Sequence, residues 1–267
     1  MTERLWAGRV FVRSGCGGNH TGVVLDECGA PADLAAALGF PDTAFVQEHI
    51  GRSVTVRTFS PYEELAQCLQ TTLATPVALG AADGETWRVR HPAGALDVQV
   101  ERAADGWLCW ARDTDAAGEP MRVGDLPGWL SAADVYRVPQ GRSRLYARVP
   151  DVAELPVFSS AEVLAVCRAY DCTAVVFFAE TAAETVRTRV FTTSLGGRED
   201  VATGGAAAGV GVLLARARRT GRIDVIQGAE EEPAGQGHLV LSLDSERHVG
   251  GRVLPLLTGR TAPWGPD

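Results

Sequence analysis

The sequence predicts an α+β protein of two domains, each a barrel-like sheet wrapped around one central helix. Short apolar and β-branched runs alternate with a few helical stretches in both halves of the chain. The segment 206–214 is apolar on almost every side, so we expect strands to surround it. The length of 267 residues lies in the range where one hydrophobic core stops growing. We therefore predict domains at residues 1–115 and 116–267.

The individual elements follow from hydrophobic periodicity and from turn signals. Strands are expected at residues 5–12, 22–25, 44–47, 54–59, 86–90, 96–100 and 108–112, and then at 144–149, 174–178, 185–192, 223–226, 239–243 and 251–257. Helices are expected at residues 32–38, 64–79, 161–170 and 203–219. Pro76 should kink or end the second helix. The segment 113–127 lacks periodicity and is the expected linker, and the C-terminal strand is free to pack back on the first domain.

Composition narrows the classes of partner. The net charge of −8 and the absence of a long basic stripe argue against nucleic acid and against an anionic membrane surface. The chain contains no lysine, which excludes a Schiff-base lysine, a pyridoxal-phosphate anchor and a Walker-type phosphate lysine. Its six cysteines form no Cys-x-x-Cys pair, so no metal site is expected. Of the classes of partner considered, a small molecule is therefore the one we expect.

Targeting signals are equally informative. We find no signal peptide before the first strand and no apolar run near the roughly 20 residues of a membrane span. The expectation is a cytoplasmic protein with reduced thiols.

Residues 199–209 read Glu-Asp-Val-Ala-Thr-Gly-Gly-Ala-Ala-Ala-Gly. Such a segment is typical of a helix N-terminus that holds an anion beside a carboxylate, because small residues expose N–H groups and the helix dipole adds positive charge. The alternative is an ordinary N-cap, in which Asp200 or Thr203 satisfies the first amides. Both interpretations stay open at this point.

Several segments, in order along the chain, resemble the PhzF family, which is named for a phenazine-biosynthesis isomerase. They are Arg9-Val-Phe-Val, Gly18-Asn-His-Thr-Gly-Val-Val-Leu25, Asp42-Thr-Ala-Phe-Val46, Phe59-Ser-Pro-Tyr-Glu-Glu-Leu65, Gly94-Ala-Leu-Asp-Val98, Arg189-Val-Phe, the 199–209 segment and Gln227-Gly228. The resemblance implies a fold shared with diaminopimelate epimerase and proline racemase, in which each of two domains is a mostly antiparallel β-sheet around a central helix. It places the active site in the cleft between the domains. It also implies a cofactor-independent homodimer that moves protons next to a carboxylate.

Departures from the family pattern fall at its site residues. The family's acid/base glutamate corresponds to Asp42, whose carboxylate is one methylene shorter and whose alternative role is a turn residue. The family's Gly-His-Pro-Thr segment reads Leu69-Gln-Thr-Thr72. Gln70 cannot carry a proton near neutral pH, but it can position a carboxylate or water, or it faces solvent. Gly205 replaces a serine and offers another exposed amide.

Two further residues could supply chemistry. Cys68 falls where racemases of this fold place one catalytic cysteine, and Thr203 falls where they place the other. A helix dipole would stabilise the Cys68 thiolate as a base, although buried cysteines usually only pack. His20 lies beside Asn19 and is the nearest titratable replacement for the lost histidine, its alternative being an exposed loop side chain.

The leading hypothesis is an isomerase that shifts a double bond in a small unsaturated carboxylic acid of secondary metabolism, for which a diene intermediate of 4-alkylproline biosynthesis is a candidate. Two alternatives remain: a Cys68-based dehydratase or epimerase of a proline-like acid, and a non-catalytic carboxylate-binding homologue. The predicted catalytic residues are Asp42, Asp200 and Cys68. The predicted substrate-binding residues are Asn19, His20, Gln70, Thr71, Thr203, Gly204 and Gly205.

Overall fold

The computed structural model describes residues 2–113, 121–124, 126–130, 134–138, 143–229, 233–244 and 246–262. The chain divides into two compact units: unit 1, Met1–Arg112 with Gly250–Asp267, and unit 2, Asp113–Val249. The C-terminal strand β17 (Arg247–Arg260) returns to unit 1 and pairs antiparallel with β1 (Arg4–Val10). Residues 114–120 of the expected linker lie outside the described residues, and near its end β9 (Met121–Arg122) pairs with β10 of unit 2.

Unit 1 is a closed ring of strands. Its other members are β2 (Asn19–Val24), β3 (Asp42–Ile50), β4 (Ser53–Phe59), β6 (Thr86–His91), β7 (Gly94–Ala103) and β8 (Gly106–Arg112). Pairing runs β1–β2–β3–β4–β6–β7–β8–β17 and returns to β1. The β2–β3 and β4–β6 pairs are parallel, and each is bridged by a helix, α1 (Pro31–Leu38) and α2 (Leu69–Ala78) respectively. Parallel neighbours need such a crossover connection.

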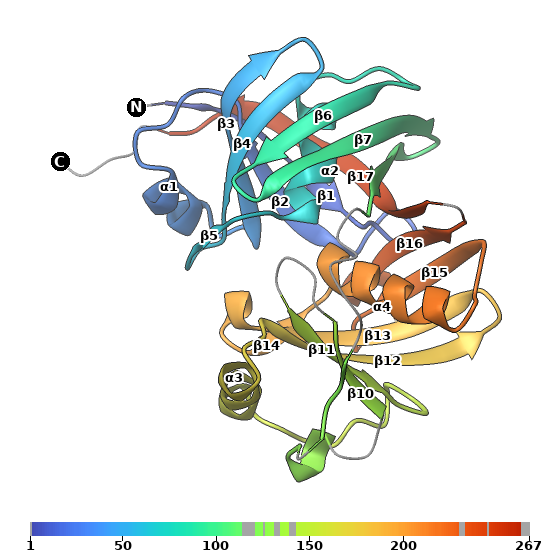
Figure 1. The fold of residues 1–267 in the computed structure, drawn as a ribbon. Helices are drawn as coiled ribbons and strands as arrows, with labels where there is room; N and C mark the ends of the chain where they lie inside the picture. Colours follow the sequence, from blue (N-terminus) through green and yellow to red (C-terminus); the bar gives the residue numbers. More distant parts are fainter. Residues whose placement is uncertain are drawn as a thin grey trace. The chain divides into compact units, whose positions relative to one another are not determined.

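Helix α2 is the centre of unit 1 (Figure 1). Every residue from Gln70 to Val77 is buried, and the helix contacts β1, β2, β3, β6, β7 and β8. Alternation along the surrounding strands, as in the exposed-buried pattern of β6, turns one side chain in two toward the helix. Pro76 is accommodated inside the last turn, because few residues follow it before the helix ends.

The start of α2 differs from the sequence prediction of residue 64. A turn at Ser60, whose hydroxyl accepts from the N–H groups of Tyr62 and Glu63, reverses the chain after β4. Glu64–Leu65 then forms β5, antiparallel to β4, and Glu64 makes a two-bonded ion pair with Arg57. Cross-strand pairing therefore wins over local helical periodicity, and the helix begins only at Leu69.

Unit 2 repeats this order of elements. Its strands are β9, β10 (Asp134–Val138), β11 (Arg144–Arg148), β12 (Ala174–Ala182), β13 (Thr185–Thr192), β14 (Arg198–Asp200), β15 (Arg222–Gln227) and β16 (Gly237–Leu243). The β11–β12 and β13–β15 pairs are parallel and are bridged by α3 (Ser160–Ala169) and α4 (Gly204–Arg216). The short strand β14 pairs with β13 just as β5 pairs with β4.

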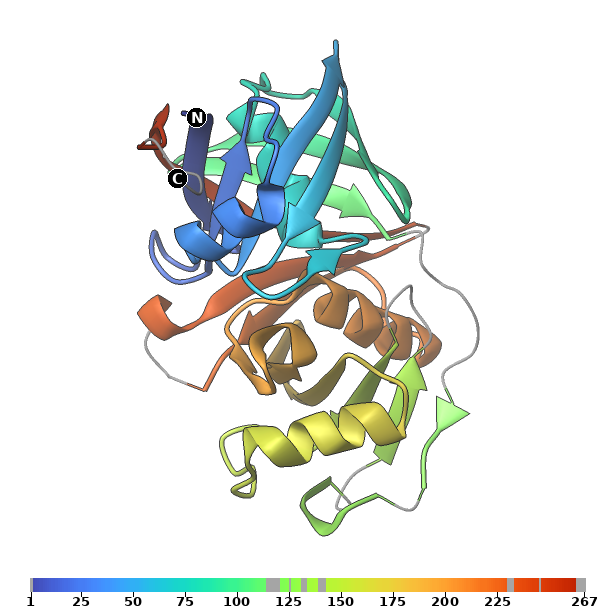
Figure 2. The same ribbon diagram turned by 90° about the vertical axis from the view of Figure 1, so that its left-hand side faces the viewer.

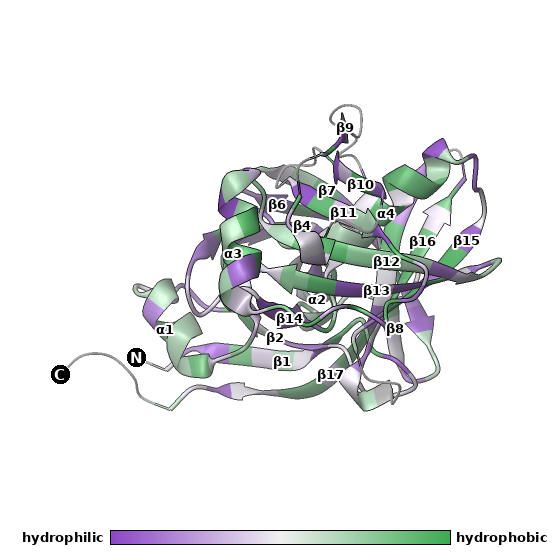
Figure 3. Cartoon of the chain, turned by 90° about the horizontal axis from the view of Figure 1, so that it is seen from below, coloured by the Kyte–Doolittle hydropathy of each residue, from purple (hydrophilic) through white to green (hydrophobic). Residues whose placement is uncertain are grey.

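The helices of unit 2 pack on opposite faces of these strands. Helix α3, yellow in Figure 2, covers an apolar cluster that includes Leu145 and Phe177, and its first turn is fixed by a Ser159–Glu162 capping box. Strand β12, which supplies Phe177, is largely green in Figure 3. Tyr146 follows Leu145 on β11 and therefore points the other way, toward α4. Its hydroxyl donates to the carbonyl of Gly205 at 3.3 Å.

Candidate functional site

The start of α2 brings Cys68 and Asp42 together. Cys68 is the N-cap residue, in extended conformation, and its Sγ donates to Oδ2 of Asp42 at 3.2 Å. Asp42 begins β3 and shares a strand face with Ala44, which pairs with Thr58. The Thr58 hydroxyl lies 2.9 Å from that of Thr71 on α2. The register of β3 and β4 therefore turns the Asp42 carboxylate toward the first turn of the central helix.

The protonation of this pair follows from its surroundings. Burial raises the pKa of the Cys68 thiol well above its usual value, and the negative charge of Asp42 raises it further. Hydrogen bonds from Thr71 act in the opposite direction but do not cancel these effects. The helix dipole does not produce the thiolate that the sequence suggested. At neutral pH the thiol is the proton donor and the Asp42 carboxylate is the acceptor.

Gln70 is not a solvent-facing helix residue, since only 3% of it is exposed. Its Oε1 accepts from Asn19 Nδ2 at 3.1 Å, and its Nε2 donates to the carbonyl of His20 at 3.1 Å and to Thr21 Oγ1 at 2.8 Å. Both amide hydrogens are thus used inside unit 1. Gln70 ties β2 to the first turn of α2, and the hydroxyl of Thr71 is similarly buried.

The side chain of His20 lies on the other face of β2. Asn19 and Thr21 point toward Gln70, so strand alternation turns the imidazole outward, where it is exposed and stacks on Phe40. Its Nε2 accepts from Arg9 Nε at 3.2 Å, and partial desolvation of the ring together with the Arg9 charge lowers its pKa. The structure does not bring this imidazole to the Asp42–Cys68 pair.

The start of α4 gathers Thr203, Asp200 and Gln227. The Thr203 hydroxyl donates to Asp200 Oδ2 at 2.5 Å, and Gln227 Oε1 accepts from the Thr203 N–H at 3.1 Å. Gln227 Nε2 donates to the Asp200 carbonyl at 2.6 Å and to Thr203 Oγ1 at 3.0 Å. Thr203 makes no side-chain capping bond to the helix, which disfavours the ordinary N-cap interpretation.

Hydrogen bonding within α4 begins at the Thr203 carbonyl, which accepts from the N–H groups of Ala206 and Ala207. The N–H groups of Gly204 and Gly205 come earlier and point out of the helix start, as in any α-helix. The positive end of the helix dipole lies at the same place. The geometry suits an anion there.

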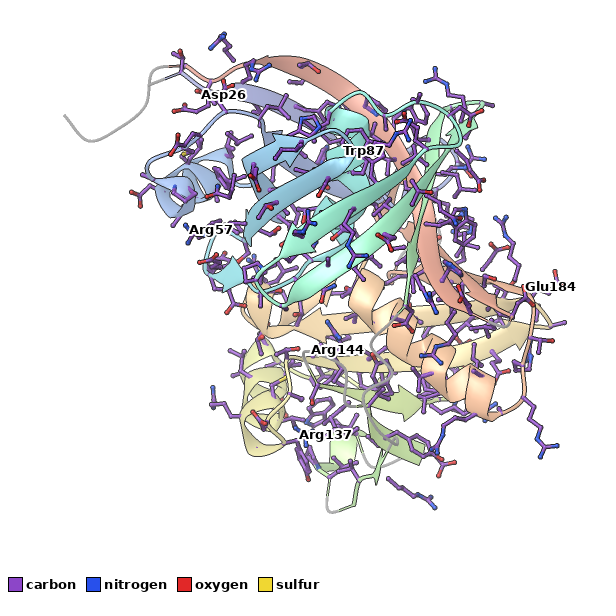
Figure 4. All side chains as sticks on the ribbon, turned by 45° about the horizontal axis from the view of Figure 1, so that its top comes forward. Asp26, Arg57, Trp87, Arg137, Arg144 and Glu184 are labelled. Atoms are coloured by element: carbon purple, nitrogen blue, oxygen red, sulfur yellow. The ribbon has the colours of Figure 1, made fainter. Side chains whose placement is uncertain are left out.

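Arg144 is a residue that the sequence interpretation missed. A Cβ on Gly205 would lie 2.5 Å from its Nη2 and 2.8 Å from its Cζ, so the guanidinium lies against the glycine. Figure 4 labels Arg144 beside α4. Gly209 leaves room for Tyr146 in the same way. The sequence did contain a signal for these two contacts. Arg144 and Tyr146 are two residues apart on a strand, and Gly205 and Gly209 are four residues apart on a helix, so each pair shares one face. Gly205 therefore makes space for a cation rather than only exposing an amide.

Among the described residues, no group of three or more His, Cys, Asp or Glu side chains is placed so that it could hold a metal ion. Within the same residues, none of the helices combines the length and apolar character needed to cross a membrane.

Residues 9–112 match the family model PhzC-PhzF, described as phenazine biosynthesis-like protein. No curated protein matches the chain.

Solved structures share the fold. A PhzF family protein from Enterococcus faecalis is 19% identical, with 98% of this chain and 100% of that chain covered and a TM-score of 0.75. A PhzC/PhzF protein from Clostridium difficile is 18% identical, with the same coverages and TM-score. A hydroxyproline epimerase from Agrobacterium vitis is 12% identical, with coverages of 97% and 92% and a TM-score of 0.66. The predicted resemblance to PhzF and the predicted epimerase-like fold are confirmed.

Proposed function

We propose that this chain, with its PhzF-like N-terminal half and fold, is a cofactor-independent isomerase that moves a proton, and with it a double bond, in a small unsaturated carboxylic acid. The observation that carries the proposal is the Asp42–Cys68 pair. A carboxylate that accepts from a protonated thiol at the start of a buried helix is a base that keeps a fixed orientation. Asp42 would remove the proton from one carbon and return it to another.

The start of α4 supplies the proposed anion site. The N–H groups of Gly204 and Gly205 and the Arg144 guanidinium would hold a carboxylate or the developing enolate charge. Arginine suits a carboxylate because its planar N–H groups match two oxygens at once. Asp200, held by the Thr203 hydroxyl, would orient the polar group of the substrate or act as the second acid.

For the substrate class we propose an acid of secondary metabolism, with a diene intermediate of 4-alkylproline biosynthesis as the first candidate. The family resemblance supports it, and so does the Agrobacterium vitis epimerase of the same fold, whose structure holds trans-4-hydroxy-L-proline. We also propose a homodimer, which sedimentation equilibrium of the purified protein tests.

Solvent exchange tests the chemistry directly. The protein in D2O is incubated with a proline that carries an exocyclic diene and, separately, with trans-4-hydroxy-L-proline, and deuterium at each carbon is measured by NMR. We expect incorporation into the diene, its loss in Asp42→Asn and its persistence in Cys68→Ala.

The other outcomes identify the other hypotheses. Exchange at the α-carbon of hydroxyproline that disappears only in Cys68→Ala would indicate the cysteine-based epimerase or dehydratase. Binding of the diene acid, measured calorimetrically, with no exchange at any carbon would indicate a non-catalytic carboxylate-binding protein. The raised thiol pKa is the observation that makes us prefer Asp42 as the base.

A further inference from the structure

A buried histidine with no assigned role lies beside the first turn of α2. His91 ends β6 and is only 7% exposed. Its Nε2 is 2.8 Å from the hydroxyl oxygen of Thr72, which follows Gln70 and Thr71 on the helix. In unit 1, Gln70 occupies the position of the family's histidine. His91 nevertheless places an imidazole against the same turn of α2.

The hydrogen bonds determine which nitrogen of His91 carries the proton. The Thr72 hydroxyl lies 2.6 Å from the Cys68 carbonyl, and a carbonyl can only accept, so the single hydroxyl proton is used there. His91 Nε2 must then donate to Thr72 Oγ1. Burial lowers the pKa of His91 to about 4, so the ring is neutral at pH 7 and its Nδ1 is an acceptor.

His91 Nδ1 is buried and has no hydrogen-bond partner among the described residues. A buried acceptor without a hydrogen-bond partner lowers the free energy of unfolding, so a histidine at this position calls for a compensating role. The other ring nitrogen, Nε2, is hydrogen-bonded to the Thr72 hydroxyl, which in turn is hydrogen-bonded to the backbone carbonyl of Cys68. The Cys68 carbonyl also accepts from the Thr72 N–H at 3.0 Å and from the Thr71 hydroxyl at 3.2 Å. Cys68 is therefore held from its carbonyl side by three donors, one of which, the Thr72 hydroxyl, is oriented by His91.

We propose that His91 is a positioning residue for the Asp42–Cys68 pair. By donating to Thr72 it fixes the hydroxyl that fixes the Cys68 carbonyl, and this keeps the N-cap residue in the conformation in which its thiol donates to Asp42. The chain of bonds ends at a carbonyl and carries no proton to the carboxylate. His91 thus orients the base without exchanging protons with it. The inference rests on the proposed function only in calling Asp42 the base.

The test reads the Cys68 thiol and needs no substrate. The rate of alkylation by iodoacetamide is measured from pH 7 to 10 in the whole protein, and the tryptic peptide of residues 58–88, which contains Cys68 as its single cysteine, is quantified by mass spectrometry. In His91→Phe the thiol should lose its contact with Asp42. A fall of one unit in its pKa would raise the rate at pH 8 by about tenfold. His91→Gln keeps a donor and should restore the wild-type rate.

Thr75 provides the matched control, since it is also fully buried and its hydroxyl donates to the Thr71 carbonyl at 2.7 Å, one turn farther along α2. Thr75→Val should leave the alkylation profile unchanged, whereas Thr72→Val should reproduce His91→Phe and serves as its replacement if that variant does not fold. Equal profiles for the Thr72 and Thr75 variants, or no rescue by His91→Gln, would overturn the proposal. Failure of the isomerase hypothesis would leave these thiol profiles unchanged, so the two are tested separately.

Discussion

The starts of α2 and α4 occupy equivalent places in the two units, yet their first turns differ in composition and in hydrogen bonding. Each begins at an extended N-cap residue whose side chain donates to an aspartate, Cys68 to Asp42 and Thr203 to Asp200. At α2 the aspartate comes from a strand that is distant in sequence. At α4 it lies three residues before the N-cap residue.

The first turns differ in the same sense. Gln70, Thr71 and Thr72 of α2 direct their side chains into hydrogen bonds inside unit 1. The glycines of α4 leave space, which the Arg144 guanidinium fills at position 205. The repeated topology thus has one helix start held by side-chain hydrogen bonds, where we propose the base, and one glycine start beside an arginine, where we propose an anion site. The following predictions test this difference.

The largest effect should separate the two aspartates. Asp42→Asn removes the proposed base and should slow deuterium exchange into the diene probe by about 1,000-fold or more, in line with general-base catalysis. Asp200→Asn keeps an acceptor for Thr203 and should cost about 10- to 100-fold. The exposed Asp97, paired with Arg88, gives the control Asp97→Asn, which should change nothing. Similar losses at 42 and 200 would contradict distinct roles.

The next effect concerns stability at low pH. Because the folded pKa of His91 lies below the unfolded value of 6.5, the unfolded state binds more protons between the two values. The contribution of the neutral ring is fully present above pH 6.5 and is lost as the pH falls toward 4. A lowering from 6.5 to about 4 corresponds to roughly 3 kcal/mol of unfolding free energy. Urea unfolding at both pH values should show this loss in the wild type and a smaller loss in His91→Gln. Identical losses would place His91 in a less buried setting.

A smaller effect should come from closing the space beside Arg144. Gly205→Ser introduces the serine of the PhzF pattern that this segment resembles but places a Cβ against the guanidinium, so it should weaken binding of the diene acid by about 10- to 100-fold, the equivalent of one charged hydrogen bond. Titration calorimetry measures this. Gly211→Ala is the control on the same helix, because a Cβ there meets ordinary contacts at 3.4 Å or more. Unchanged binding in Gly205→Ser would remove Arg144 from the anion site.

The smallest effect should follow from making the two N-caps alike. Cys68→Ser replaces the thiol by a hydroxyl, the donor that Thr203 uses at α4, and should change the exchange rate by about threefold or less. Thr203→Val removes the matching donor and should cost more. A large loss in Cys68→Ser would instead point to sulfur chemistry at α2.

Much of the fold was accessible from local pattern. The apolar helix α4 and the strands β4 and β13 follow from periodicity, and the bounds of β13 agree with those predicted. The parallel pairs β2–β3 and β4–β6 were not predicted, because strand direction depends on long-range pairing. The start of α2 could not be predicted, because Glu64 lies on β5 and forms an ion pair with Arg57 on the neighbouring strand β4. The periodicity of a short stretch of sequence does not reveal such a cross-strand partner. The return of β17 to β1 likewise joins the two ends of the chain.

By itself the sequence determined the α+β class, the repeated order of strands and helices and the resemblance to PhzF, because these depend on residue types and spacings along the chain. The tertiary structure decided which groups meet: the Cys68 thiol as donor to Asp42, Gln70 bound to β2, His20 turned outward, His91 against Thr72 and Arg144 against Gly205. Strand register and burial set those contacts, and with them the protonation of the site, because both join segments that are far apart in sequence.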